Sequence, residues 1–379
     1  MKITKIGQPQ IVMSNPSSRH NYFGWPTAIR LQNGKIAVVA SGNRMSHICP
    51  FGKTVISYSE NEAESYTSPA PVIDTTLDDR DGGICTFGEN GVIVTSFNNT
   101  RAFQKHCLSL FECIPDKAKN AYAAAYLETV SDNDEQRDLG ATFKISNDGG
   151  ITFGELLKSP ITSPHGPCEL SDGTILWVGT LYDDNALKDG ENTIKVYTID
   201  PENGNMTYVS EIENITLDDG YIPYSCEPYA MQAADGTIIA QIRVQHKDDR
   251  KSGIFTIYQS ESSDNGKSWT KPHAVLDDLM GGSPPHILKA SDGTLIGTYG
   301  FRKCDPFGVK AMISTDNGKS WDTDHYLYEN HITSDLGYPS TVELSDGSFL
   351  TVFYACPEKS TTSSPATAVI LQQKWKLDK

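Results

Sequence analysis

A short phrase recurs six times along this chain and limits what the chain can fold into. It consists of an apolar segment, then Asp-Gly or Asn-Gly, then a segment in which apolar residues alternate. This arrangement is the strongest short-range signal for a β-hairpin, and we expect both turn residues to adopt positive φ. The six glycines are Gly34, Gly91, Gly173, Gly236, Gly293 and Gly347. Hairpins at intervals of 54 to 82 residues predict six sheet modules in one repeat domain spanning residues 1–379.

A second phrase, S-x-D-x-G-x-[ST]-aromatic, lies between the hairpins. It occurs at residues 146–153, 262–269 and 314–321, and a degenerate copy occupies residues 59–66. The Asp accepts hydrogen bonds from turn amides, the Gly lets the chain reverse, and we expect the aromatic residue to pack back between sheets. We therefore interpret these residues as markers of the fold and not as catalysts.

Composition narrows the range of functions. The chain has 32 basic and 48 acidic residues, and its net charge of −16 disfavours nucleic acid or an anionic membrane as a partner. It contains no apolar run of about 18 residues, the length that predicts a membrane span. The N-terminal residues lack the apolar region of a signal peptide, and the eight cysteines show no disulfide-like spacing. We expect a cytoplasmic protein with reduced thiols, or a secreted one if a leader was removed.

The second phrase resembles the Asp-box, or BNR, repeat of the sialidase superfamily. The resemblance covers essentially the whole chain and implies an all-β fold, a six-bladed β-propeller. It also implies that residues 366–375 and residues 3–12 share the blade that closes the ring. The longest interval between hairpins holds an insertion at residues 101–139, and its segment 116–128 is rich in helix-forming residues. We expect a short helix there, beside the mouth of the central funnel.

Two of the hairpin windows are similar to catalytic segments of sialidases. Tyr338 precedes Asp346 by eight residues, and Glu227 precedes Asp235 by eight residues. Arg243 follows Glu227 by sixteen residues, which also fits the family pattern. The resemblance implies that Tyr338 is a nucleophile, that Glu227 is the base that activates it, and that Arg243 is one arm of a clamp for a substrate carboxylate.

Elementary chemistry is consistent with these three roles. A substrate that carries a carboxylate on its anomeric carbon repels an attacking carboxylate, whereas a neutral phenol avoids that repulsion, and sialidases use a tyrosine nucleophile. A phenol with a pKa of about 10 needs a neighbouring base to take its proton. A planar guanidinium group binds a carboxylate through two parallel hydrogen bonds.

Other positions depart from the sialidase pattern. Gly24 stands where the first clamp arginine is expected, and Trp25 follows it with an aromatic face on which a sugar can stack. Arg302 is the nearest candidate for the third clamp arginine. Further arginines could reach the site from neighbouring loops, and these are Arg19, Arg44 and Arg80.

The acid/base expected for the family is also missing. Sialidases place an aspartate in the loop after the first hairpin, but residues 44–53 contain no acidic residue. His47 in that loop is one candidate, because an imidazole with a pKa of about 6.5 can protonate a leaving oxygen at neutral pH. Asp81, where the second inner strand should begin, is the other candidate.

Two more histidines fall on predicted inner strands. His165 and His286 lie in the third and fifth modules, and together with His47 they would face the funnel as acids or as contacts to substrate hydroxyl groups. Their spacing does not fit a metal site, so we predict no metal ligand and no cofactor.

These observations lead to one expectation and two alternatives. We expect an exo-acting, retaining glycoside hydrolase of the sialidase superfamily that removes a terminal sialic acid or a related acidic sugar from a glycan or glycoconjugate. The first alternative is a polysaccharide lyase or atypical glycosidase that uses histidine and Tyr338. The second is a glycan-binding propeller without catalysis, since propellers carry many functions. The sequence leaves the oligomeric state open.

Overall fold

The computed structural model describes residues 1–110, 114, 116–182, 193–246, 255–276, 282–302, 306–331, 333–356 and 367–378. Within these residues the strands form six antiparallel sheets, the blades of a propeller, and the chain adds three helices. Residue 366, where the sequence predicted the last strand to begin, lies outside the described residues, as do Cys113 and Cys304.

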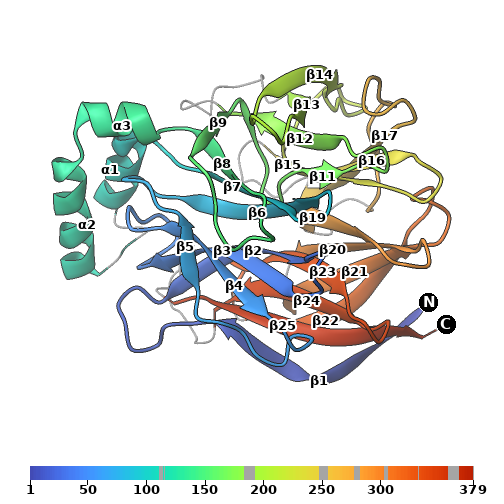
Figure 1. The fold of residues 1–379 in the computed structure, drawn as a ribbon, viewed down its shortest axis with the longest axis horizontal. Coiled ribbons are helices and arrows are strands. Elements are labelled where there is room, and N and C mark those ends of the chain that lie inside the picture. Colours follow the sequence, from blue (N-terminus) through green and yellow to red (C-terminus); the bar gives the residue numbers. More distant parts are fainter. Residues whose placement is uncertain are drawn as a thin grey trace.

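The blades follow one another along the chain (Figure 1). Blade one contains β2 (Tyr22–Arg30), β3 (Ile36–Arg44), β4 (Lys53–Ser59) and β5 (Ala70–Ile73). Blade two contains β6 (Arg80–Phe87), β7 (Gly91–Phe97), β8 (Ala141–Ser146) and β9 (Leu157–Ser159). Blade three contains β10 (Ile161–Thr162), β11 (Cys168–Glu169), β12 (Ile175–Leu181), β13 (Ile194–Ile199) and β14 (Met206–Ile212).

The second half of the ring repeats this order. Blade four contains β15 (Tyr224–Gln232), β16 (Ile238–Gln245), β17 (Phe255–Ser262) and β18 (His273–Ala274). Blade five contains β19 (Gly282–Lys289), β20 (Leu295–Phe301), β21 (Phe307–Ser314) and β22 (Asp322–His331). Blade six contains β23 (Gly337–Glu343), β24 (Phe349–Ala355), β25 (Val369–Asp378) and, from the other end of the chain, β1 (Lys2–Met13).

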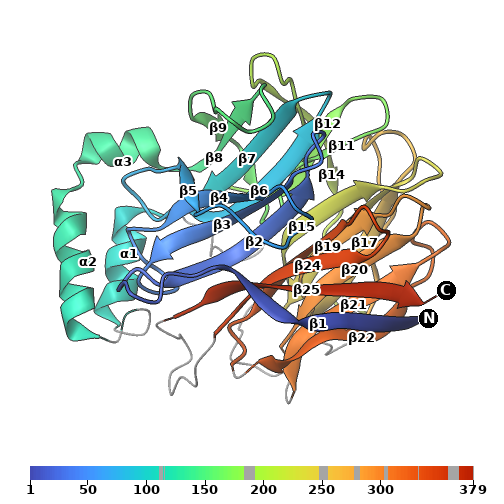
Figure 2. The same ribbon diagram turned by 60° about the horizontal axis from the view of Figure 1, so that its bottom comes forward.

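The ring closes as the sequence predicted. Strand β1 pairs antiparallel with β25, so that Lys2 lies opposite Asp378, and the two strands run side by side in Figure 2. The innermost strand of blade six, β23, packs against β2 of blade one. The first and last segments of the chain therefore complete one sheet.

The hairpins form where they were predicted, but their turns differ from the expectation. In the second blade Gly91 begins β7 without positive φ, and Gly88 adopts the positive φ of that turn. Gly34, Gly173, Gly236, Gly293 and Gly347 adopt φ between 77° and 90°, whereas the Asp or Asn before each of them does not adopt positive φ. The expectation that both turn residues take positive φ was therefore wrong. Each of these acidic or amide side chains instead accepts a hydrogen bond from the amide two residues later, as Asp346 does from Ser348. This is the longer hairpin built on a type I turn with glycine in the left-handed position.

The Asp-box turns follow the third strand of blades one, two, four and five. In the box at 314–321, Ser314 Oγ donates to Asp316 and accepts from the amide of Gly318, while Asp316 accepts from the amide and hydroxyl of Ser320. Trp321 ends this box and donates from Nε1 to Gln259 of blade four at 2.9 Å. The boxes thus join neighbouring blades, and they support the interpretation of these residues as fold markers.

The insertion in blade two contains the helices α1 (Arg101–Ser109), α2 (Lys117–Thr129) and α3 (Asp132–Asp138), which form a separate layer beside the propeller (Figure 1). Each begins at a capping residue, namely Thr100, Asp116 and Ser131. Apolar side chains of α1 and α2 pack on the loop after β3, where Met45 and Cys49 are buried. None of the described helices is long and apolar enough to cross a membrane.

Candidate active site

Five inner strands carry a β-bulge at the same level of the ring. The bulge residues are Trp25-Pro26, Asp81-Gly82, Glu227-Pro228, Pro284-Pro285 and Tyr338-Pro339. Trp25, Asp81, Glu227 and Tyr338 adopt φ of 55°, 47°, 50° and 48° there. Non-glycine residues rarely adopt positive φ, and such strained conformations concentrate at functional sites. The bulges therefore identify this part of the pore as the candidate active site.

The structure brings Tyr338, Glu227 and Arg243 into direct contact. The phenol of Tyr338 donates to Glu227 Oε1 at 2.5 Å, and Arg243 Nη1 donates to Glu227 Oε2 at 2.6 Å. Arg243 Nη1 also lies 3.3 Å from the Tyr338 hydroxyl. Tyr338 is 5% exposed, while the side chains of Glu227 and Arg243 are 20% and 13% exposed, so a buried hydroxyl meets a partly exposed carboxylate and guanidinium group. This arrangement holds a proton acceptor on a phenol, as nucleophilic activation requires.

Burial and charge set the proton affinities of this trio. Burial raises the pKa of Tyr338 well above its usual value, and the negative charge of Glu227 raises it further, while Arg243 acts in the opposite direction. Burial alone would lower the pKa of Arg243, but the attraction of Glu227 outweighs it and the pKa of Arg243 is raised. The phenol is thus neutral at rest, and Arg243 carries a fixed positive charge beside it.

Arg302 lies over the ring of Tyr338. Its guanidinium carbon is 5.7 Å from the centre of the Tyr338 ring, and Nε and Nη2 donate to the carbonyl of Leu336 at 3.2 and 2.7 Å. Nη2 also approaches the hydroxyl of Tyr354 at 3.4 Å. Two of the predicted arginines therefore lie close to Tyr338, Arg243 at its hydroxyl and Arg302 over its ring.

Arg44 and Arg80 both lie over the ring of Trp25, at 4.9 and 4.2 Å from its centre. Arg44 is fully buried and forms an ion pair with Asp78 at 2.6 Å. Both arginines also donate to the carbonyl of His47, at 2.7 and 2.6 Å. Trp25 itself is 1% exposed, so its ring is a packing partner of the arginines. This burial argues against the predicted stacking of a sugar on Trp25.

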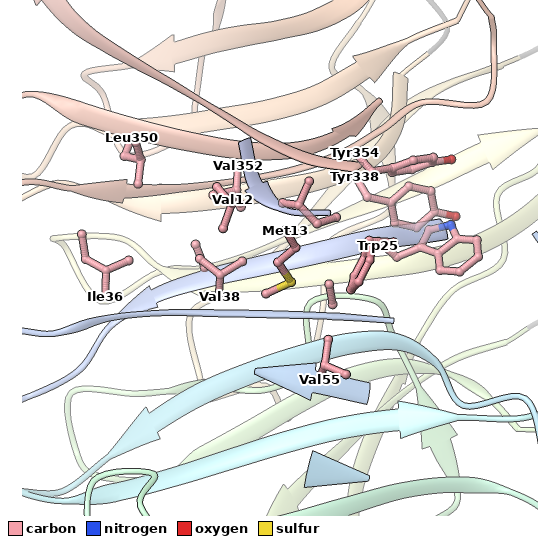
Figure 3. Close-up of a cluster of buried hydrophobic side chains, with 14 of the residues drawn as sticks. Val12, Met13, Trp25, Ile36, Val38, Val55, Tyr338, Leu350, Val352 and Tyr354 are labelled. Carbon is pink, nitrogen blue, oxygen red and sulfur yellow. The ribbon is translucent and has the colours of Figure 1, made fainter. Parts of the chain in front are cut away.

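Figure 3 shows Trp25, Tyr338 and Tyr354 together at one end of the apolar core between blades one and six. Gly24, which occupies the position of the first clamp arginine, lies against Tyr354 of this group and against Tyr22. A Cβ at Gly24 would lie 3.3 Å from the Tyr22 ring and 4.0 Å from the Tyr354 ring. Aromatic side chains thus line the place where the resemblance implied an arginine.

His47 lies in a hydrogen-bond network that the sequence did not reveal. Its Nδ1 is 3.2 Å from the hydroxyl of Tyr22 and 3.4 Å from Asp335. Asp335 also accepts from Tyr22 and Tyr354, at 2.9 and 2.6 Å. Burial pushes the pKa of Asp335 upward, but the charge and hydrogen bond of His47 and the hydrogen bond of Tyr354 outweigh it and hold the pKa well below its usual value. Asp335 is therefore a permanent anion between blades one and six.

Asp81 lies in blade two and lines a pocket with Glu227 and Arg243. It is 7% exposed, and its Oδ1 has no hydrogen-bond partner among the described residues. Burial raises the pKa of Asp81 to about 7, against the opposing charge of Arg80. The sequence placed this residue at the start of the second inner strand, and the structure places it in the bulge that corresponds to those of Glu227 and Tyr338.

The other two predicted histidines lie apart from this pocket. His165 and His286 are 1% and 4% exposed, with ring centres 5.0 Å apart, and both pack on Tyr229. Burial lowers the pKa of His165 well below its usual value and that of His286 to about 3. Neither histidine lines the pocket of Asp81 and Glu227, because their rings are packed inside the ring of blades. Arg19 is also distant, with its guanidinium over the ring of Tyr122 in the insertion.

A spacing of sixteen residues after each bulge residue identifies further residues of the site in the sequence. Arg243 stands opposite Cys226, the residue before the blade-four bulge, and Tyr354 stands opposite Gly337 in the same way in blade six. In blade two Phe97 stands opposite Arg80. Each follows its bulge residue by sixteen positions. Among the described residues, no group of three or more His, Cys, Asp and Glu side chains has the arrangement of a metal site.

Comparison with solved structures shows that the fold is that of sialidases. A protein of unknown function from Dyadobacter fermentans has a TM-score of 0.73 at 18% identity, over 99% of both chains. A leech intramolecular trans-sialidase has a TM-score of 0.65 at 13% identity, over 98% of this chain and 70% of that one. A sialidase from Streptococcus pneumoniae has a TM-score of 0.64 at 11% identity, over 97% and 70%. At such identities the likeness shows the fold alone.

The chain belongs to the BNR repeat-like domain family. The sequence model of that family matches residues 120–351, which is more than half of the chain. The comparison with curated protein sequences found no match. The predicted all-β, six-bladed propeller with Asp-box turns is confirmed, and so is its likeness to the sialidase superfamily.

Proposed function

We propose that this protein is an exo-acting, retaining glycoside hydrolase. The observation that carries the proposal is the contact of Tyr338 with Glu227 at 2.5 Å, with Arg243 bonded to the same carboxylate. A protein that only binds glycans has no need of a proton acceptor bonded to a buried phenol. The sialidases among the structural neighbours have the same fold, which is compatible with the proposal.

In the proposed reaction the Tyr338 oxygen attacks the anomeric carbon of the terminal sugar. Glu227 takes the phenol proton as the bond forms, because the pKa of Tyr338 is too high for the phenolate to exist beforehand. Arg243 limits the negative charge that builds up on the phenol oxygen, since its Nη1 lies 3.3 Å away. The product of this step is a sugar bound covalently to Tyr338.

The proposed substrate class is a terminal acidic sugar, such as a sialic acid, a related ulosonic acid or a uronic acid. Its support is that Arg243 and Arg302 both lie close to Tyr338, since guanidinium groups bind carboxylates with two hydrogen bonds. Because Gly24 replaces the first arginine, the clamp has two arms. We therefore expect weaker discrimination for a carboxylate than a three-armed clamp would give.

A panel of aryl glycosides tests the proposal. Sialic acids, uronic acids and common hexoses are incubated with the wild type, with Tyr338→Phe and with Tyr299→Phe as a matched control. Tyr299 is also a buried tyrosine, but it lies on β20, away from Glu227. We expect at least one acidic glycoside to be hydrolysed, with a loss of about 1,000-fold or more in Tyr338→Phe and less than tenfold in Tyr299→Phe.

Three results would contradict the proposal. Equal turnover by the Tyr338→Phe variant would show that Tyr338 is not the nucleophile. An unsaturated, ultraviolet-absorbing product would identify a polysaccharide lyase instead. Binding of glycans with every glycoside inert would identify a non-catalytic glycan-binding propeller.

A further inference from the structure

A pocket of about 230 Å³ opens between blades two, three and four, next to the phenol–carboxylate pair. Its charged lining residues among the described ones are Asp81, Glu227 and Arg243. Neutral polar and aromatic residues, including Asn99 and Thr180, form much of the remaining wall. Thr180 Oγ1 is buried and has no hydrogen-bond partner in the described part of the chain. A pocket with unpaired polar atoms and two carboxyl groups suits a ligand rich in hydroxyl groups.

The carboxyl groups near the pore differ in how their oxygens are occupied. Glu227 uses both oxygens, on Tyr338 and Arg243. Asp335 uses both oxygens on Tyr354 and Tyr22, and Asp79 accepts from Thr75 with both of its own. Asp81 differs from these, because its buried Oδ1 has no partner within the described residues. An unsatisfied buried carboxyl oxygen costs free energy, so it calls for a functional explanation.

His47, the other candidate acid, is already engaged on both ring nitrogens. Nδ1 faces Tyr22 and Asp335, and Nε2 lies 3.4 Å from the guanidinium group of Arg80. An imidazole held on one side by a phenol and a carboxylate, and on the other by a guanidinium group, directs neither ring nitrogen into the pocket that Asp81 and Glu227 line. The loop at 44–53 therefore does not supply the proton donor that the reaction needs.

We propose that Asp81 is the general acid and base of the hydrolysis, supplied by blade two. This inference rests on the proposed function and deepens it by naming the group that protonates the leaving oxygen. Its support is the shared pocket with Glu227 and Arg243, the free Oδ1, and the bulge that holds Asp81 at the same level as the other two reacting side chains.

The two steps balance as follows. In the first, the Tyr338 oxygen bonds to the anomeric carbon and gives its proton to Glu227, while the glycosidic bond breaks and its oxygen takes the proton of Asp81. In the second, ionised Asp81 takes a proton from water, and the water oxygen bonds to the anomeric carbon. The bond to Tyr338 breaks with its electrons on the phenol oxygen, which recovers the proton from Glu227.

The electrostatic setting suits an acid that must be protonated near neutral pH. Burial raises the pKa of Asp81 to about 7, so the carboxyl group is protonated below that pH and ionised above it. Four charged groups act on it: Arg80 and Arg44 from blades two and one, and Glu227 and Arg243 from blade four. Glu227 favours the protonated form and the three arginines favour the ionised form.

Dependence on the leaving group tests the proposal. The acid matters for poor leaving groups and hardly for a dinitrophenolate, which departs without a proton. For Asp81→Asn we expect kcat/KM to fall by about 100- to 10,000-fold on alkyl or sugar glycosides of the active sugar, and by less than tenfold on its dinitrophenyl glycoside. For Asp81→Ala, azide should raise kcat on the dinitrophenyl glycoside and yield a glycosyl azide, because an anion replaces the missing base.

Asp79→Asn is the matched control, because Asp79 is the adjacent buried carboxyl group and burial also raises its pKa to about 7. Its oxygens are bonded to Thr75, so we expect no change in leaving-group dependence. If the Asp81 variants do not fold, the wild type still gives an answer. Its kcat/KM should fall above pH 7 on unactivated glycosides and stay level on the dinitrophenyl glycoside.

Each outcome decides the matter. Equal losses on both substrate classes in Asp81→Asn, or a wild-type pH profile that does not depend on the leaving group, would overturn the assignment of Asp81. If Tyr338→Phe is inactive while Asp81→Asn keeps full activity on alkyl glycosides, the hydrolase proposal stands and Asp81 is not its acid. If the wild type hydrolyses no glycoside, both proposals fail together.

Discussion

Two recurring features of the blades can be compared, the outer Asp-box turns of blades one, two, four and five and the bulges of five inner strands. The outer turns repeat almost atom for atom: a serine hydroxyl accepts from the amide of Gly150, Gly266 and Gly318 in three different blades. The inner bulges repeat only in backbone conformation. They carry Trp25, Asp81, Glu227 and Tyr338, four side chains of different chemistry, at nearly the same φ.

The difference separates what maintains the propeller from what reacts inside it. The same serine–glycine hydrogen bond recurs in the outer turns of three blades, so we interpret it as part of what joins neighbouring sheets. The bulges share a backbone conformation but carry different side chains, so they can bring different chemical groups together in the pore. Substitutions at the outer turns should therefore change stability but not activity. At the pore, some substitutions should change mainly stability and others mainly activity.

The largest effect on stability is expected at the pore, from Asp78→Ala. Arg44 and Asp78 are both fully buried, so removal of the carboxylate leaves a charged guanidinium group without a counterion. We expect the free energy of unfolding to fall by about 3–5 kcal/mol, as for other broken buried pairs. Denaturant unfolding measures this. Asp74→Ala, which breaks the exposed pair with Lys53, should cost less than about 1 kcal/mol. A similar small cost for both would show that the pair at the pore does not stabilise the fold.

The next effect is on activity, from Arg243→Ala. Its hydrogen bonds to Glu227 and Tyr338 are charge-assisted, and such bonds contribute about 1.5–3 kcal/mol. We expect kcat/KM to fall about 10- to 100-fold on the active glycoside, through a higher KM and a lower kcat. Arg30→Ala serves as control, because Arg30 pairs with Glu62 at the other end of the pore. An unchanged kcat/KM in Arg243→Ala would show that this side chain touches neither sugar nor nucleophile.

A smaller loss of stability is expected from Ser314→Ala in an outer turn. The substitution removes the acceptor of the buried Gly318 amide and a donor to Asp316. An unsatisfied buried amide costs about 1–3 kcal/mol, which denaturant unfolding can resolve. Activity of the folded protein should not change. A lower kcat/KM in fully folded Ser314→Ala would show that the outer turns also affect activity.

The smallest effect is expected from repair of the degenerate box with Asn61→Asp. Asn61 accepts from the amide of Ser65 and donates to its hydroxyl, whereas in the intact boxes the Ser hydroxyl donates to an aspartate. An aspartate is the stronger acceptor, so we expect a gain of less than about 1 kcal/mol at neutral pH. The gain should disappear as the new carboxylate is protonated at low pH. A loss of stability at neutral pH would show that the turn depends on the hydrogen bond that the Asn61 side-chain amide donates to Ser65.

The fold could be predicted from the sequence because its signals are local and repeated. The hairpins and boxes are short local motifs, and the spacing of the hairpins predicted six blades. The resemblance to the sialidase superfamily implied the closing strand. The turn geometry of the hairpins was predicted wrongly, because the carboxylate side chain bonds to the amide two residues later and so leaves the left-handed position to glycine alone.

Much of the candidate site was also predictable, since Tyr338, Glu227 and Arg243 are found by their distance from a turn. The network around Asp335 was not, because it joins residues 288 positions apart, such as His47, without any local pattern. The burial of His165 and His286 could not be predicted from the sequence either. Periodicity assigns a residue to an inner strand, but it does not say whether its ring faces the pocket or packs on Tyr229.

The pairing of β1 with β25 has a consequence for how the site comes into being. The sheet that carries Tyr338 is complete only when Lys2 meets Asp378, one of the longest loops this chain can close. Glu227 belongs to another sheet, and the phenol reaches it only across the interior of the ring. We therefore expect the reactive pair to assemble late in folding, so that a chain whose ring is still open lacks the bond between Tyr338 and Glu227.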